Sequence, residues 1–324
     1  MTTDSKIEWT GPTWNPITGC DQVSTGCDNC YAMKLAKRLK AMGSAKYQND
    51  GDPRTSGPGF GVTVHPAAML DPLRWKKPSL VFVNSMSDVA HGRVPRSAVV
   101  LMWAVMALAG RHQFQVLTKR PRRLARMLAN PTFLADVAAK ASEIMASRPW
   151  QRWQLDLGGQ RVAADSGRGG GWTVTPTGDS GNLWTPPWPL PNVWLGVSIE
   201  NDDYCWRADQ LRRAPAAVRF LSCEPLLGPL HSLDLAGIDW VIVGGESGDK
   251  DVRAMDQEWA GELVRRCGSI GVPLFAKQLG TVLARELGLR HDKGGDPAEW
   301  PWTWPREFPP AAQLALAGTG RVAG

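Results

Sequence analysis

The chain has 324 residues, of which 43% are hydrophobic and 21% are charged. This composition excludes a disordered chain, and the length suits two domains of roughly 150 residues or one α/β barrel. No run approaches the roughly 18 consecutive apolar residues of a membrane span, and the first residues lack a secretory profile. We therefore expect a cytoplasmic protein with no membrane partner. The net charge of +6 permits a nucleic-acid partner without requiring one.

Short apolar runs alternate with segments of helical spacing along the chain. Continuous apolar runs separated by helices are typical of parallel strands covered on both faces. The predicted strands are 80–83, 114–117, 193–197, 218–221, 240–243 and 272–276. The predicted helices occupy 95–106, 121–127, 203–213 and 259–267. This many units favours an α/β fold, a full or partial βα barrel, over residues 1–282.

Two segments interrupt the alternation. Residues 136–190 hold a helical stretch and then a run rich in Gly, Ser and Asp. We interpret them as an insertion with a flexible loop that could act as a lid. Residues 283–324 form a C-terminal tail with a Trp/Pro run at 300–305, which we expect to pack along the outside of the barrel.

Three of the six cysteines crowd into one short segment as Cys20, Cys27 and Cys30, in a C-x6-C-x2-C pattern. In a reducing compartment such crowding indicates a metal or redox site rather than disulfides. Gly19 and Gly26 allow the tight turns that a metal-binding loop needs. Three thiolates fit a [4Fe–4S] cluster with one open iron. Structural zinc stays open as an alternative, because a distant Cys or His could complete its four ligands.

Nearly every predicted strand is followed by polar residues, and in a βα barrel these positions converge on the catalytic face. Carboxylates there suit ribose hydroxyls or an ammonium group, whereas lysines suit a carboxylate or a phosphate. The alternative is that strand ends become polar simply where they meet solvent. The candidate residues are Asn84, Ser85, Asp88, Lys119, Arg120, Ser198, Glu200, Cys223, Glu224, Glu246 and Lys277.

The glycine-rich run from Gly244 to Gly248 has two interpretations. It could cradle a phosphate, or it could be a tight turn after a strand. The run matches neither the P-loop nor the dinucleotide-binding fingerprint, so the sequence does not decide between them.

Several of these segments together resemble one known family. Residues 7–10, 13–16 and the cysteine segment from Gly19 to Ala32 look like the signature of the phage-associated three-Cys-motif family. The resemblance continues through residues 82–88, 117–121, 195–198, 220–228, 240–248 and 275–278. That family is similar to radical SAM enzymes, and its nearest well-understood relative is spore photoproduct lyase.

The resemblance implies a partial TIM (βα) barrel of the radical SAM type, with a [4Fe–4S] cluster on Cys20, Cys27 and Cys30. It also implies S-adenosylmethionine (SAM) on the open iron, its cleavage to a 5′-deoxyadenosyl radical, and an electron donor such as flavodoxin or ferredoxin. The Gly-Gly-Glu that binds the SAM amino group in such enzymes is missing after the second barrel strand, so Ser85 and Asp88 take that role here. The full set assigned to SAM is Tyr31, Asn84, Ser85, Asp88, Ser198 and Glu200.

Spore photoproduct lyase acts on thymine in DNA, and phage genomes often carry modified thymines. We therefore expect an enzyme of the host-cell cytoplasm that modifies or rearranges a nucleic-acid base, such as a hypermodified thymine in phage DNA. Basic clusters at 34–40, 74–77 and 119–123 suit a nucleic-acid backbone, although the first could equally be a solvated helix face.

Roles in the reaction follow from the strand-end positions. The catalytic candidates are Cys223, Lys119 and Glu224, and the substrate-binding candidates are Arg120, Glu246 and Lys277. Cys223 could donate a hydrogen atom to a product radical or could be a small wall residue. Two other functions stay open: a zinc-stapled DNA-binding protein without catalysis, and a radical SAM enzyme for a small nucleotide or a peptide.

Overall fold

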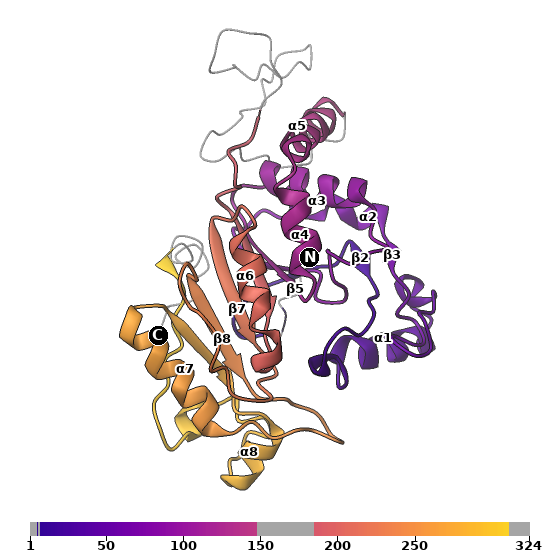
Figure 1. The fold of residues 1–324 in the computed structure, drawn as a ribbon. Coiled ribbons are helices and arrows are strands. Elements are labelled where there is room, and N and C mark those ends of the chain that lie inside the picture. The colour runs from indigo at the N-terminus through magenta and orange to yellow at the C-terminus, as the bar shows by residue number, and fades with distance from the viewer. Residues whose placement is uncertain (1–4, 6, 148–184, 311–324) are drawn as a thin grey trace.

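The computed structural model describes residues 5, 7–147 and 185–310. Its centre is a sheet of seven parallel strands in the order β1-β4-β5-β6-β7-β8-β9, curled into a half-barrel with helices on its outer face (Figure 1). The α/β fold and the partial barrel predicted from the sequence are confirmed. The predicted flexible loop within 136–190 lies outside the described residues. In the part of the chain that is described, no helix is long and apolar enough to cross a membrane.

All six predicted strands are present, and a seventh was missed. The strands of the main sheet are β1 (Thr13–Trp14), β4 (Leu80–Val83), β5 (Gln113–Thr118), β6 (Val193–Ser198), β7 (Val218–Cys223), β8 (Trp240–Gly244) and β9 (Leu274–Gln278). The missed strand, β1, has two residues and stands between Pro12 and Pro16, so it carries no periodicity. A separate antiparallel pair joins β2 (Ile17–Thr18) to β3 (Thr63–Val64).

The helices of the described segments are α1 (Tyr31–Ala41), α2 (Pro66–Met69), α3 (Arg96–Leu108), α4 (Pro121–Leu128), α5 (Pro131–Ala146), α6 (Trp206–Arg212), α7 (Gln257–Ile270) and α8 (Thr281–Glu286). The four predicted helices are present as α3, α4, α6 and α7, whereas α1, α2 and α8 were not predicted. No helix lies between β7 and β8, in the described residues 224–239. Short 3-10 turns occupy Thr25–Cys27, Ala45–Tyr47, Asp71–Arg74, Asp202–Tyr204 and Pro297–Glu299.

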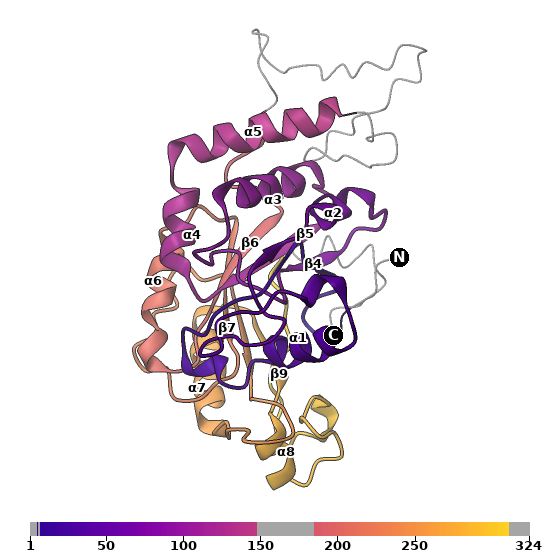
Figure 2. The same ribbon diagram turned by 90° about the vertical axis from the view of Figure 1, so that its right-hand side faces the viewer.

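Helix α3 is apolar on nearly every side because it is buried between two other elements. One side packs on the sheet, and α5 lies across the other (Figure 2). Trp103 of α3 meets Phe133 of α5 with ring centroids 5.9 Å apart. Asn130 caps α5, so the helix begins before residue 136 and the predicted start of the insertion falls inside it.

The two faces of the curled sheet carry different cores. Side chains on the outer face pack under the helices, whereas those on the inner face fill the space inside the half-barrel, which we call the lumen. Successive side chains of a strand point to opposite faces of the sheet. In β4, Leu80 and Phe82 therefore point into the lumen, and Val81 and Val83 point outward. The lumen cluster comprises Trp9, Leu80, Phe82, Trp194, Val218, Phe220, Trp240, Ile242 and Phe275.

The C-terminal tail covers two parts of the barrel. Trp300, Trp302 and Trp304 pack against the outer core. Phe308 instead reaches the lumen cluster and stacks on Trp240 with centroids 5.5 Å apart. The tail therefore closes the lumen at the amino ends of the strands. The carboxyl ends, where polar residues follow the strands, are left for a site.

Gly196 gives a test of lumen packing. A Cβ at this position would lie 2.3 Å from the Phe220 ring. We expect Gly196→Ala to lower the free energy of unfolding by about 1–3 kcal/mol through overpacking. Urea unfolding measures this, with Gly268→Ala at an exposed position of α7 as control, because a Cβ there meets nothing within 4 Å. Equal stability of the two variants would contradict the packing described.

His112 gives a test of pH dependence. Burial, aided by the charge of Arg111, lowers the pKa of His112 to about 4, so this buried ring is neutral in the folded protein at pH 7. The unfolded chain binds the proton near pH 6.5, so stability falls as pH drops from 6.5 to 4, by about 3 kcal/mol for this group. The free energy of unfolding, measured in urea, should therefore change less between pH 7 and pH 4 for His112→Asn than for the wild type. The same change with pH in both proteins would refute this role of His112.

Candidate functional site

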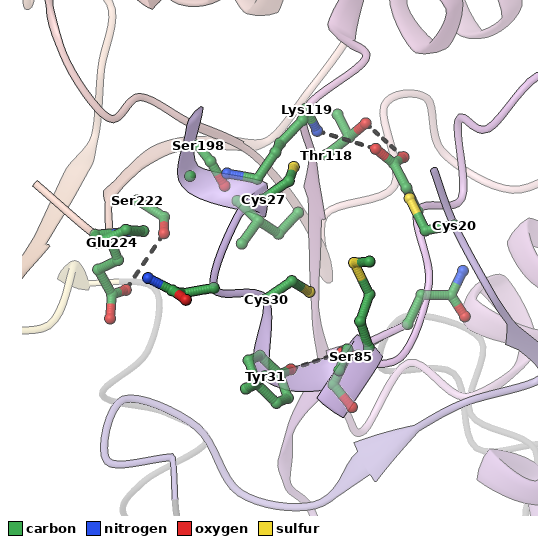
Figure 3. A pocket seen from close by; sticks show the side chains of 18 of the residues that line it. Cys20, Cys27, Cys30, Tyr31, Ser85, Thr118, Lys119, Ser198, Ser222 and Glu224 are labelled. Carbon is green, nitrogen blue, oxygen red and sulfur yellow. Dashed lines mark hydrogen bonds between the residues drawn. The ribbon is translucent and has the colours of Figure 1, made fainter. Parts of the chain in front are cut away.

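A cavity of about 520 Å³ opens at the carboxyl ends of the strands, where the sequence predicted convergence. The three clustered cysteines form one wall of it, with Ser198 beside Cys27, and Ser222 and Glu224 lie to one side of them (Figure 3). The predicted candidates that line it are Cys20, Cys27, Cys30, Tyr31, Asn84, Ser85, Asp88, Lys119, Arg120, Ser198, Glu224, Glu246 and Lys277. Of the predicted residues, Glu200 and Cys223 do not line it.

Residues 19–30, the cysteine loop, are shaped by two glycines. Gly19 has a φ of +88°, and a Cβ there would lie 2.2 Å from the carbonyl oxygen of Gly61. At Gly26 a Cβ would lie 2.5 Å from the Glu200 side chain. The loop then enters α1 directly after Cys30, so all three cysteines are held by close backbone packing.

Cys20 and Cys30 sit where an isolated thiolate is costly. Burial raises the pKa of Cys20 to about 12, with a further contribution from Asp88 and opposition from Arg120. Burial also raises the pKa of Cys30. Arg120 donates a hydrogen bond from Nη1 to Cys20 Sγ at 3.2 Å. Deprotonation here therefore needs additional positive charge, which a bound metal supplies.

Glu200 joins the cysteine loop to the barrel from below. Its carboxylate is fully buried, pairs with Lys119, and accepts a hydrogen bond from Arg207 at 2.8 Å. Ser24 of the loop donates to the same carboxylate at 2.8 Å. Glu200 was predicted to bind SAM in the cavity, but its carboxylate oxygens are occupied beneath the loop, so we assign it a positioning role.

Glu246 holds the other side of the cysteine loop. It accepts a hydrogen bond from Asn29 at 3.0 Å and pairs with Arg253. Arg253 in turn donates to the Thr25 carbonyl at 2.8 Å and pairs with Asp28 at 3.1 Å. Glu246 was predicted to bind substrate, and these contacts make it part of the scaffold of the loop.

Asp88 is also occupied by the protein. Its carboxylate accepts from Thr118 at 2.7 Å, from the Lys119 backbone at 3.1 Å and from Arg120 at 3.0 Å. It was predicted to bind the SAM amino group, yet it serves here to direct Arg120 toward Cys20. Arg120, predicted to contact substrate, is used in the same way.

Glu224 and Lys277 pair across the cavity wall at 2.7 Å. Ser222 donates to the other oxygen of Glu224 at 3.3 Å. Both charged groups are largely buried yet line the cavity, so they can bind polar groups of a ligand.

Tyr31 and Ser85 lie together on the cysteine side of the cavity (Figure 3). The Tyr31 hydroxyl donates to the Ser85 carbonyl at 2.6 Å, and the Ser85 hydroxyl bonds to Asn15 at 3.2 Å. Asn15 also accepts from the Met86 backbone at 3.1 Å. These contacts fix the turn after β4 beside the cysteines.

Cys223 does not face the cavity, so that prediction is wrong. Phe220 and Ser222 of β7 face the lumen, and alternation therefore turns Cys223 outward into the helix-covered core, where it is fully buried. The sequence could not show this, because an apolar run buried on both faces hides its alternation. The placement gives no support to a hydrogen-donor role for Cys223.

Several residues of the site were missed by sequence reasoning. Arg207 lies in a segment that looks polar and exposed, and Arg253 and Asn29 lie in loops. No spacing in the sequence links Arg253 to residues 25–29, more than 220 positions away. The glycine turn at Gly245 is explained by packing, because a Cβ there would lie 2.2 Å from the Leu279 carbonyl oxygen.

The basic clusters occupy different ends of the barrel. Residues 74–77 precede β4 and so lie at the amino ends of the strands, away from the cavity. Arg122 covers the Trp206 ring at 4.6 Å, and Arg123 donates to the His91 carbonyl at 2.8 Å. Lys34 and Lys37 of α1 are exposed beside the cysteine loop.

Comparison with known families finds a match over residues 4–303 to a family described as "Protein of unknown function (DUF5131)". The chain belongs to this family. Neither a comparison with curated proteins nor one with solved structures finds a match. The family description names no activity, so the function must be argued from the site.

Glu200 allows a test of the anchor beneath the loop. Glu200→Gln leaves Lys119 and Arg207 without a counter-charge in a buried position. We expect it to lower the free energy of unfolding by about 3 kcal/mol, as for breaking a buried ion pair. Glu262→Gln is the matched control, because Glu262 pairs with Arg265 at an exposed site. Urea unfolding compares the two, and a similarly small loss in both would contradict the anchoring role.

Proposed function

We propose that this protein is a radical SAM enzyme that binds a [4Fe–4S] cluster through Cys20, Cys27 and Cys30 and modifies or rearranges a nucleic-acid base. One observation carries the proposal: three thiols of a single short loop form a wall of a cavity at the carboxyl ends of parallel strands. That is the end of a βα barrel where active sites lie.

The cysteine set suits a cluster in its ligand count. A structural zinc site usually takes four protein ligands, whereas a [4Fe–4S] cluster can be held by three thiolates on three of its irons. Three cysteines leave one iron without a protein ligand, where SAM would bind.

The chemistry that the bound cluster and SAM supply is one-electron cleavage of the S–C5′ bond, which yields methionine and a 5′-deoxyadenosyl radical able to take a hydrogen atom from substrate. The chain holds the cysteine loop through Glu200 and Glu246. Tyr31 and Ser85 border the cysteine side, where SAM would lie. The Glu224–Lys277 pair is left on another part of the cavity wall for polar groups of the substrate.

A nucleic acid is the partner we propose, with a redox protein such as flavodoxin or ferredoxin as electron donor. The exposed lysines of α1 offer positive charge next to the cysteine loop. The packed apolar cluster of the lumen closes the bottom of the cavity, which would keep water away from a base bound above it.

Anaerobic reconstitution tests the cluster. We expect brown protein with about four iron and four sulfide per chain, and dithionite reduction with SAM should release 5′-deoxyadenosine. The triple variant Cys20→Ala, Cys27→Ala, Cys30→Ala should lose both, whereas Cys205→Ala, a buried cysteine outside the cavity, should keep them. Colourless protein with one zinc per chain and no SAM cleavage would overturn the proposal.

A further inference from the structure

Arg120, directly after β5, contacts a sulfur of the cysteine loop. Its Nη1 donates a hydrogen bond to Cys20 Sγ at 3.2 Å, and its Nη2 donates to the Asp21 carbonyl at 2.7 Å. The Arg120 side chain is only 16% exposed, so water screens its charge little. The guanidinium is therefore held at a fixed place beside the sulfur, where its charge acts strongly.

Asp88 holds Arg120 from the other side. Its Oδ2 accepts from Arg120 Nη1 at 3.0 Å, so one guanidinium nitrogen bridges a carboxylate and the Cys20 sulfur. Burial raises the pKa of Cys20, the negative charge of Asp88 raises it further, and Arg120 opposes both. Arg120 and Asp88 thus act on negative charge at the Cys20 sulfur with opposite sign.

The other two sulfurs of the loop have different surroundings. The Ser24 hydroxyl lies 3.7 Å from Cys27 Sγ, but it donates its proton to Glu200 at 2.8 Å. Burial raises the pKa of Cys30, and backbone amides at the start of α1 oppose that effect. Within the described segments, Cys20 is therefore the one cysteine of the loop whose sulfur accepts a hydrogen bond from a charged side chain.

Reduction at this site adds one negative charge next to the ligand sulfurs. One electron enters from dithionite or from the redox protein proposed above, with no proton transferred and no bond broken. A cation or a hydrogen-bond donor at a ligand sulfur stabilises the added charge, whereas a nearby carboxylate destabilises it. Arg120 therefore favours the reduced form, and Asp88 disfavours it.

We propose that Arg120, held in place by Asp88, sets the reduction potential of the cluster through its hydrogen bond to Cys20. It makes reduction easier than three buried thiolates alone would allow. Arg120 acts through Cys20, so it is a positioning residue, and this role replaces its predicted contact with substrate. The inference rests on the proposed function for the cluster itself.

Redox titration of the reconstituted protein without SAM tests the inference, with the reduced cluster followed by electron paramagnetic resonance. Arg120→Gln removes the charge and the donor that reaches Cys20. At a fixed solution potential the ratio of reduced to oxidised cluster should fall about tenfold, a downward shift of about 59 mV for one electron. Asp88→Asn keeps an oxygen that can accept from Arg120 and removes the opposing charge, so the potential should rise.

Arg122→Gln is the matched control. Arg122 carries the same charge two positions away, but it covers the Trp206 ring at 4.6 Å and has no hydrogen bond to a cysteine within the described residues. Its potential should equal that of the wild type. Iron and sulfide are counted in every variant. If Arg120→Gln binds less iron, the direction of the Asp88→Asn shift decides, because a purely structural contact gives no reason for a rise.

Two outcomes would overturn the inference and leave the function intact, in proteins that hold a cluster and cleave SAM. One is a potential of Arg120→Gln equal to that of the wild type, and the other is a potential of Asp88→Asn that is unchanged or lower. A wild type that holds no cluster would overturn both. A potential that follows Arg120 and Asp88, without release of 5′-deoxyadenosine, would refute the function and keep the inference.

Discussion

The site depends on the anchoring of the cysteine loop by buried charge. Glu200 sits below the loop with two cations, and Glu246 holds its other side through Asn29 and Arg253. Carboxylates at such positions are stable only with well-placed partners, since each lost partner leaves an uncompensated charge. The loop therefore has one arrangement relative to the barrel, and this fixes the thiols against the cavity wall.

Alternation along the strands sets the chemistry of the lumen. On several strands the last aromatic residue that points inward is followed two positions later by a polar one, as Phe82 precedes Asn84 and Phe220 precedes Ser222. Large rings thus fill the amino end and polar groups collect at the carboxyl end. The same alternation sends Cys223 into the outer core, although its neighbours on both sides line the cavity.

The architecture could be predicted because it depends on local patterns. Six strands and the helices between them follow from apolar runs and spacing, and the convergence of strand ends follows from parallel topology. The partners of the polar side chains could not be predicted. Asp88, Glu200 and Glu246 were expected to face ligands, but arginines and backbone groups from distant segments occupy them. Pairing between residues far apart in the sequence produces no local pattern of residue spacing. Strand β1 was missed for a different reason, because two residues are too few to show a periodicity.

The distance in sequence between the loop and its anchors has a consequence for biosynthesis. The thiols leave the ribosome early, whereas Arg253, which bonds to Thr25 and Asp28, is translated more than 220 residues later. Domains assemble from such contacts only when both segments exist. The nascent chain thus carries three unanchored thiols until Arg253 has been translated, and the cluster proposed above would bind only after that point.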